Sequence, residues 1–228
     1  MTDLFAATAL QPLAERMRPK RIADMVGQQR LLSGDSALRQ AIEAGHIHSM
    51  VLWGPPGCGK TTLALLIAQY AKARFISISA VMSGLPEVRK VLAEAEQYFL
   101  RGESTVLFID EVHRFNKVQQ DAFLPFIEKG SIVFIGATTE NPSFELNSAL
   151  LSRCRVHVLE AVPEHAIVAA LQAALADKIN GIGTDVGVSD VQLSSIARAA
   201  DGDVRRALTL LEIAAEVASG NGGVITEN

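Results

Sequence analysis

The chain has 228 residues and a formal net charge of −4, which argues against a globally basic nucleic-acid binder. Hydrophobic residues make up 49% and charged residues 20%, so the chain is globular and long enough to bury a core. It has no apolar run as long as a membrane span, no secretory signal pattern, and two widely separated cysteines, Cys58 and Cys154. We therefore expect no membrane partner and a cytoplasmic location.

The amino-terminal part of the sequence is predicted to precede the folded core. Residues 1–20 are expected to form an extended or loosely ordered arm, which ends in a basic cluster of Arg16, Arg18, Lys20 and Arg21. The pattern over residues 34–45 predicts a helix with Leu38 and Ile42 on one face. An apolar run at 50–53 then predicts the first strand.

Residues 54–61 fit the G-x-x-x-x-G-K-[ST] phosphate-binding loop, between that strand and a helix-forming run at 62–68. Its glycines allow backbone N–H groups to face phosphate oxygens, and the helix beginning at Lys60 presents its positive end to them. Lys60 is expected to reach the β- and γ-phosphates, and the Thr61 hydroxyl to bind Mg²⁺. The expected nucleotide-contacting residues are Gly54, Pro55, Pro56, Gly57, Cys58, Gly59, Lys60, Thr61 and Thr62.

Strands and helices alternate after the loop, and this alternation predicts a parallel sheet with helices on both faces. The expected strands cover 75–78, 105–109, 132–136 and 156–159, and the expected helices cover 87–100 and 119–129. After Pro163 three helices are predicted with no strand between them, over 164–176, 191–200 and 204–218. We expect three parts: an arm at 1–20, an α/β nucleotide-binding core at 21–161 and a helical lid at 162–228. Asp203 is a candidate N-cap of the last helix.

Two acidic residues, Asp110 and Glu111, follow the apolar strand at 105–109. Neighbouring residues of a continuing strand point to opposite faces. Both acids meet one ligand only if the strand ends here, at the carboxyl edge of the sheet where ligands bind in such folds. Asp110 is then expected to hold Mg²⁺, directly or through water, and Glu111 to polarise the attacking water. The alternative is a charged strand end without a ligand.

Two further patterns are near-misses of known motifs. Residues 116–119, Asn-Lys-Val-Gln, resemble the guanine-reading N-K-x-D motif, but Gln119 lacks the carboxylate that accepts the guanine edge. A GTPase is therefore not expected. Residues 110–113, Asp-Glu-Val-His, resemble a helicase D-E-x-H box, yet the chain is short for the two nucleotide-binding lobes of such helicases.

The order of motifs resembles the AAA+ ATPases of the clamp-loader and RuvB clade. The shared features are the phosphate loop, the Asp110-Glu111 strand, Ala137-Thr138-Thr139, Ser152-Arg153-Cys154 and Gly202-Asp203-Val204-Arg205. Residues 110–125 and 136–153 more specifically resemble the RarA family, also called MgsA, whose eukaryotic relative is the Werner helicase-interacting protein. The resemblance runs from about Pro12 to the end of the chain.

This resemblance implies roles for several residues. Thr138 corresponds to sensor 1, Arg153 to an arginine finger that acts on ATP in a neighbouring subunit, and Arg205 to sensor 2. Arg205 and Arg206 lie about 100° apart around a helix, so only one of them faces the phosphates. Arg18 and Pro19 belong to a segment that wraps the adenine. The alternatives are a strand-capping threonine, a surface arginine and an arginine packed in the first turn of its helix.

The resemblance also implies a function: a DNA-dependent ATPase in replication-fork maintenance and recombination, which uses ATP and Mg²⁺ to remodel DNA ends or protein–DNA complexes. DNA, single-stranded-DNA-binding protein and further copies of the chain are the implied partners, and the nucleoid is the implied location. Family members carry a further C-terminal region for tetramer formation, so assembly of this chain is expected to be weak. The alternatives are a clamp-loader-like subunit, a Holliday-junction motor, or a nucleotide-gated scaffold with little turnover. Glu111 argues against the scaffold, which needs no water-polarising acid.

Overall fold

The structure is a computed structural model that describes residues 11–182 and 186–220, and it divides the chain into two units. The α/β unit comprises residues 28–54 and 59–159. The helical unit comprises the described residues up to Gly27, the short segment Pro55–Cys58, and those from Glu160 onward. No helix among the described residues is long and apolar enough to cross a membrane.

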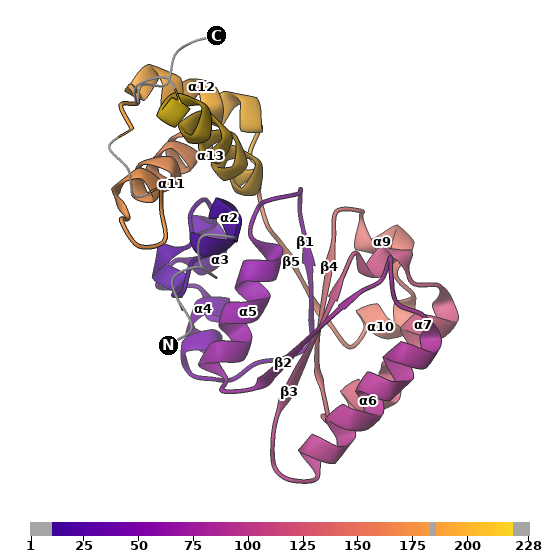
Figure 1. Cartoon of the computed structure of the whole chain (residues 1–228). Coiled ribbons are helices and arrows are strands. Elements are labelled where there is room, and N and C mark those ends of the chain that lie inside the picture. The colour runs from indigo at the N-terminus through magenta and orange to yellow at the C-terminus, as the bar shows by residue number, and fades with distance from the viewer. Residues whose placement is uncertain (1–10, 183–185, 221–228) are drawn as a thin grey trace, which may run out of the picture. The chain divides into compact units, whose positions relative to one another are not determined.

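A five-stranded parallel sheet forms the centre of the α/β unit, which confirms the predicted fold class (Figure 1). Its strand order is β2-β3-β4-β1-β5. The strands are β1 (Met50–Trp53), β2 (Arg74–Ser79), β3 (Thr105–Asp110), β4 (Val133–Thr138) and β5 (Arg155–Val158). Trp53 at the end of β1 is paired with Thr138 at the end of β4, and Ile109 of β3 with Gly136. The carboxyl ends of β1, β3 and β4 therefore meet at one edge of the sheet.

Helices α5 (Lys60–Tyr70) and α6 (Leu85–Phe99) lie on opposite sides of this sheet (Figure 1). One core cluster joins strand residues that alternate along β3 and β4 to the buried face of α6; its members include Leu107, Ile109, Phe134, Val88 and Leu92. The intervening residues Val106 and Phe108 are also buried, on the other face. Burial on both faces explains why these strands read as continuous apolar runs. Helix α4 (Ala37–Glu43) buries Leu38 and Ile42, as predicted.

The single helix predicted over residues 119–129 is wrong. The structure has two short helices there, α7 (Lys117–Asp121) and α8 (Leu124–Lys129). Pro125 has no N–H to donate to the carbonyl of Asp121, so the hydrogen-bond ladder of α7 cannot continue through it. Pro125 instead occupies the first turn of α8, where a missing N–H costs nothing. The interruption leaves Phe123 fully buried in the core.

The Asn-Lys-Val-Gln sequence that resembles a guanine-reading motif is a capping box. The Gln119 N–H donates to the Asn116 side chain at 3.0 Å, and the Asn116 N–H donates to the Gln119 side chain at 3.0 Å. This reciprocal pair starts α7 and satisfies two backbone donors of its first turn. The motif therefore has a structural role, and the prediction that it does not read guanine gains a physical reason.

Further short elements connect the strands and complete the α/β unit. These are α3 (Gln29–Leu32), η2 (Val112–Arg114), α9 (Pro142–Glu145) and α10 (Ser148–Leu151). Asn141 and Asn147 cap α9 and α10 through their side chains. The asparagine-rich stretch after β4 is thus a pair of capped turns.

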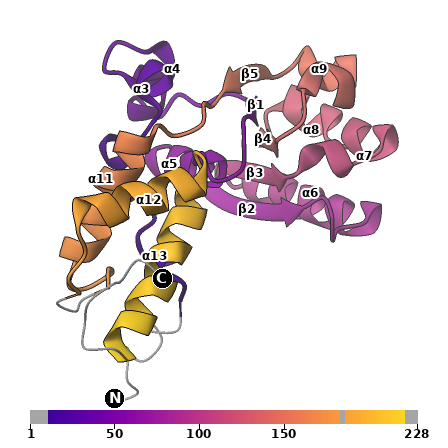
Figure 2. The same cartoon turned by 90° about the horizontal axis from the view of Figure 1, so that it is seen from above.

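The helical unit contains the three helices predicted after Pro163, α11 (Glu164–Ala176), α12 (Asp190–Ala200) and α13 (Val204–Gly220), packed side by side (Figure 2). It also contains η1 (Ile22–Asp24) and α2 (Leu13–Arg16). The extended conformation expected of the arm does not hold for α2. Its Leu13 is fully buried, and Arg16 forms an ion pair of 3.1 Å with Glu212 of α13. Residues 1–10 of the predicted arm lie outside the described residues.

Candidate nucleotide-binding site

The phosphate loop follows β1 and leads into α5 with two glycines in left-handed conformations, Gly57 at φ +64° and Gly59 at φ +102°. Only glycine adopts this region without strain. A Cβ on Gly57 would lie 1.7 Å from Oδ1 of Asp203, which belongs to the same unit. A Cβ on Gly54 would lie 2.4 Å from the carbonyl oxygen of Leu159. The loop thus needs glycine for both its backbone shape and its packing, as a backbone cradle for phosphate does.

Lys60 is the first residue of α5, and its side chain is buried. Its Nζ donates a hydrogen bond of 2.8 Å to the carbonyl oxygen of Gly54, the first residue of the loop. The ammonium group is therefore held beside the loop and the positive end of α5, where phosphate oxygens are favoured. Thr61 follows in the first turn of the same helix.

The two acids after β3 differ in backbone conformation. The strand ends at Asp110, and Glu111 has φ +54° and ψ +45°, in the left-handed region. For a residue with a side chain this conformation costs about 1–3 kcal/mol, and such strain concentrates at functional sites. The Glu111 N–H donates to Oδ1 of Asp110 at 3.2 Å. Because Glu111 lies outside the strand in this conformation, the alternation of side chains between the two faces of a strand does not apply to it.

His113 connects Glu111 with the end of β4. Its Nδ1 lies 3.3 Å from Oε2 of Glu111 and 2.9 Å from Oγ1 of Thr138. In the sequence, His113 belongs only to a helicase-like pattern, from which no role in the site follows. The spacing of that pattern, one histidine two residues after the acid, was the available signal.

Thr138 ends β4 and is fully buried. Its hydroxyl accepts a hydrogen bond of 3.0 Å from the N–H of Glu140, and its carbonyl oxygen accepts one of 3.2 Å from the N–H of Gly54. The threonine therefore caps its strand, as the structural alternative predicted, and it also touches the first residue of the phosphate loop. These bonds complete a continuous series of polar contacts within the α/β unit, which runs through Lys60, Gly54, Thr138, His113 and Glu111.

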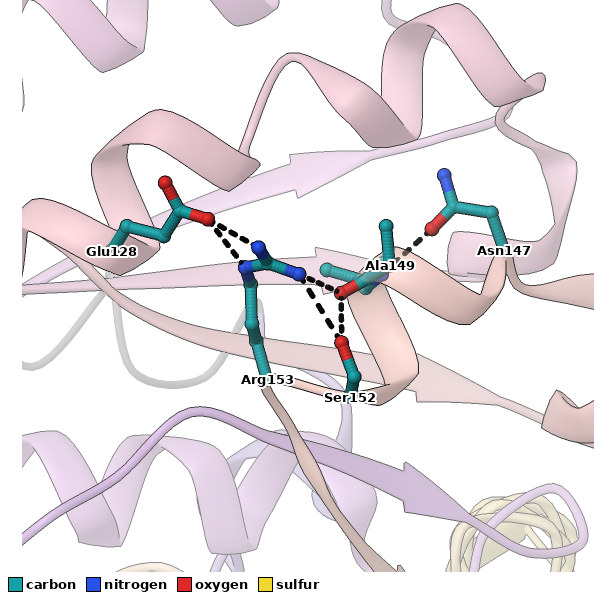
Figure 3. A network of polar contacts seen from close by, with 6 residues as sticks. Glu128, Asn147, Ala149, Ser152 and Arg153 are labelled. Atoms are coloured by element: carbon teal, nitrogen blue, oxygen red, sulfur yellow. Dashed lines mark hydrogen bonds and ion pairs between the residues drawn. The ribbon is translucent and has the colours of Figure 1, made fainter.

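Arg153 follows α10 and is held by contacts within its own chain (Figure 3). Its Nε and Nη2 both donate to Oε1 of Glu128 in α8. Its Nη1 donates to the carbonyl oxygen of Ala149 at 2.8 Å and to the hydroxyl of Ser152 at 3.1 Å. The side chain is partly exposed, as a residue offered to a second molecule must be.

Three further predicted site residues, Arg205, Arg18 and Pro19, lie in the helical unit. Asp203 caps α13 as expected, because its Oδ1 accepts the N–H of Arg206 at 2.9 Å. Arg205 is exposed in the first turn of that helix. Arg18, which precedes Pro19, donates from Nε to Glu15 at 3.1 Å. These local contacts leave the predicted roles of Arg205, Arg18 and Pro19 toward a nucleotide as proposals.

The residues present fit a magnesium–nucleotide complex. Glycines with positive φ, the start of α5 and Lys60 offer the backbone N–H groups and the positive charge that phosphates would need. The Thr61 hydroxyl and the Asp110 carboxylate supply the hard oxygen ligands that Mg²⁺ prefers, and Mg²⁺ usually takes its other ligands from phosphates and water. The donor set therefore matches the predicted cofactors, ATP and Mg²⁺.

The sequence matches proteins of one family. Residues 50–161 match the model of the "ATPase family associated with various cellular activities (AAA)". Over 215 residues the chain is 55% identical to Replication-associated recombination protein A of Escherichia coli (strain K12), and the match covers 94% of this chain and 48% of that protein. Over 210 residues it is 41% identical to ATPase WRNIP1 of Dictyostelium discoideum, covering 92% of this chain and 24% of that protein.

The fold is similar to that of solved structures of RuvB. The Thermotoga maritima RuvB Holliday junction branch migration motor matches with a TM-score of 0.74 and 29% identity. This match covers 92% of the present chain and 70% of the RuvB chain. The chain spans about half the length of the bacterial recombination protein it matches. Both the phosphate loop and the Asp110-Glu111 pair lie within the segment that matches the AAA family.

Proposed function

The chain belongs to the AAA ATPases, in the family of replication-associated recombination protein A, and from this premise we propose that it hydrolyses ATP to act on DNA. The observation that carries the proposal is the series of polar contacts from Lys60 to Glu111. It joins a lysine suited to phosphate with an acid suited to activating water. A binding module that only senses nucleotide has no need of the second group.

In the proposed mechanism the loop N–H groups and Lys60 bind the phosphates of ATP, and Thr61 and Asp110 hold Mg²⁺. The metal ion, when bound, neutralises charge on the phosphate oxygens. Glu111 orients and polarises the water that attacks the γ-phosphate. His113 and Thr138 fix the direction of the Glu111 carboxylate, which matters because phosphoryl transfer depends mainly on positioning and charge.

Arginines complete the charge compensation in this proposal. Arg153 of one subunit acts on ATP bound to its neighbour, so hydrolysis depends on assembly. An arginine finger is typically worth 10³–10⁵ in rate. Arg205 acts on ATP of its own subunit, and Arg18 and Pro19 contact the adenine. The exposure of Arg153 supports a role toward a second molecule.

DNA is the proposed client, because similar bacterial proteins are named for replication-associated recombination. With a net charge of −4, the chain has to bind DNA through a local patch or through the geometry of an oligomer. Further copies of the chain and single-stranded-DNA-binding protein are the proposed protein partners. A branch-migration motor is a second candidate, favoured by the similarity to the RuvB motor structure.

The proposal is tested by measuring ATP hydrolysis against protein concentration, without DNA, with a duplex carrying a single-stranded end, and with a four-way junction. We expect turnover per chain to rise with concentration and with DNA. Arg153→Ala is expected to abolish turnover and retain ATP binding, whereas Lys60→Ala is expected to lose both. A preference for the junction would favour the branch-migration motor. ATP binding without turnover under every condition would favour the nucleotide-gated scaffold.

A further inference from the structure

We propose that Glu128 is a positioning residue that holds Arg153 in a resting place and competes with a neighbour's phosphate for its guanidinium group. This inference rests on the proposed role of Arg153 as an arginine finger and adds a residue to that mechanism. It predicts that removing the charge of Glu128 makes hydrolysis easier to start. That direction is opposite to the usual effect of removing a contact from an active site.

The guanidinium group has few donors left in this arrangement (Figure 3). An arginine side chain carries five N–H donors and no acceptor. The N–H of Nε and one N–H of Nη2 donate to Oε1 of Glu128. The two N–H groups of Nη1 donate to the carbonyl oxygen of Ala149 and to the hydroxyl of Ser152. The edge formed by Nε and Nη2 is one of the two through which a guanidinium group binds a carboxylate or a phosphate in a forked geometry. Glu128 therefore occupies an edge that a phosphate could use.

The side of the guanidinium that faces α10 is held differently. Asn147 caps α10 by accepting the N–H of Leu150 at 2.7 Å, and its own N–H donates to the Gln120 side chain at 2.8 Å. Leu150 is fully buried, and Gln120 is buried. The Ala149 carbonyl thus sits on a short helix that is fixed to the core. We assign this contact to orienting Arg153 and the Glu128 contact to holding it back.

The position of Glu128 in its helix does not stabilise its negative charge. Glu128 lies in the last turn of α8, where the carbonyl ends disfavour a carboxylate. Its side chain is 54% exposed, so its ion pair with Arg153 is screened by water. Exposed pairs of this kind contribute about 0.2–1 kcal/mol, which is weak enough to yield to the several negative charges of ATP. The pair is suited to a resting contact that breaks on assembly.

The test compares Glu128→Gln with Glu96→Gln in the full 228-residue chain. Glu96 pairs with Lys129, the residue after Glu128, so the control removes the same charge from a neighbouring ion pair. We measure the protein concentration that gives half-maximal ATP turnover. Glu128→Gln is expected to lower it by about 1.4- to 5-fold, the factor equivalent to the strength of an exposed pair. Glu96→Gln is expected to leave it unchanged.

The double variant Glu128→Gln/Arg153→Ala separates positioning from a general effect on the fold. Arg153→Ala alone is expected to abolish turnover, so if Glu128 acts through Arg153 the double variant stays as inactive as Arg153→Ala. A persistent gain in the double variant would overturn the inference, as would a Glu128→Gln chain that behaves like Glu96→Gln or needs more protein. If Arg153→Ala hydrolyses ATP as fast as the wild type, Arg153 is not an arginine finger, and the proposal on which this inference rests is wrong.

A second measurement does not depend on turnover. The side-chain Nε–H resonance of Arg153 is recorded by nitrogen-15 NMR in nucleotide-free protein at low concentration. The inference requires this resonance to shift in Glu128→Gln and to stay in place in Glu96→Gln. An unchanged resonance in Glu128→Gln would show that the resting contact does not form in solution, and the inference would fail even if the ATPase proposal stood.

Discussion

Nδ1 of His113 lies 2.9 Å from the hydroxyl oxygen of Thr138, and the same nitrogen lies 3.3 Å from Oε2 of Glu111. One imidazole thus joins the acid after β3 to the threonine that ends β4. Since Thr138 also accepts the N–H of Gly54 through its carbonyl, the histidine connects the acid to the start of the phosphate loop. We infer from these distances that His113 positions the Glu111 carboxylate.

His113→Ala is therefore expected to lower the turnover number for ATP by about 10- to 100-fold, the cost of a misplaced catalytic group. ATP affinity should change little, because the proposed effect of the histidine is on the direction of the Glu111 carboxylate, through its contacts with Glu111 and Thr138. Turnover and nucleotide affinity are measured in parallel, with His165→Ala, at an exposed position of α11, as the control. Equal loss of affinity and turnover would assign His113 to binding instead.

The left-handed conformation of Glu111 predicts a conflict between stability and activity. Glycine adopts φ +54° without strain, so Glu111→Gly is expected to raise the free energy of unfolding by about 0.5–1 kcal/mol. It should also abolish ATP hydrolysis, because the water-polarising carboxylate is lost. Lys72→Gly is the matched control, since Lys72 has φ +52° outside the site.

Denaturant unfolding and ATP turnover distinguish the two substitutions. Both variants should gain stability, and Lys72→Gly alone should keep its turnover. If Glu111→Gly instead loses stability while Lys72→Gly gains it, the contacts of the Glu111 side chain stabilise the fold by more than its backbone strain costs.

We expect Gly57→Ala to lose nucleotide binding, because the substitution disturbs both the packing and the backbone conformation of the phosphate loop. In Gly57→Ala the new methyl group overlaps the Asp203 carboxylate, and the residue must keep φ +64°. Overpacking typically costs about 1–3 kcal/mol, and the left-handed backbone adds about 1–2 kcal/mol. We expect ATP binding to be lost, because the loop relieves the overlap by changing shape.

Gly102→Ala is the control for backbone strain alone. Gly102 has φ +81°, yet no atom lies within 4 Å of the position that the new methyl group would occupy, so only the backbone cost applies. Unfolding free energy and ATP affinity are measured for both variants. Comparable ATP affinity in the two would show that the close approach of Asp203 to Gly57 has no bearing on the loop.

The strands and the phosphate loop could be predicted from the sequence because their signals are local. The continuous apolar run of β3 and the acids that follow it predicted a buried strand and the place where it ends. The break between α7 and α8 was missed because the apolar pattern continues across Pro125, while the hydrogen-bond ladder does not. Helix periodicity alone does not register a missing N–H.

The contacts around the site could not be predicted from the sequence. Arg153 and Glu128 are 25 residues apart, as are Thr138 and His113, so their pairing depends on how the strands order themselves in the sheet. Arg153 and Thr138 could be singled out by resemblance, whereas His113 belonged only to a helicase-like pattern. The distances between these side chains could not be predicted, and Glu128 had no distinguishing motif at all.

We expect the folded state to lose stability in mild acid because of His157 in β5. Burial lowers the pKa of its imidazole to about 4, and the neighbouring His48 and Arg155 add to the effect. As the pH falls from about 6.5 to 4, the unfolded chain binds a proton that the folded chain does not, so the folded state becomes less stable. After solvent screening we expect a contribution on the order of 1–2 kcal/mol.

Urea unfolding at about pH 7 and about pH 4.5 measures this contribution. The extra loss of stability at the lower pH should appear in the wild type and in the exposed-site control His165→Gln, and should be absent from His157→Gln. An equal pH dependence in all three chains would mean that His157 protonates freely in the folded protein.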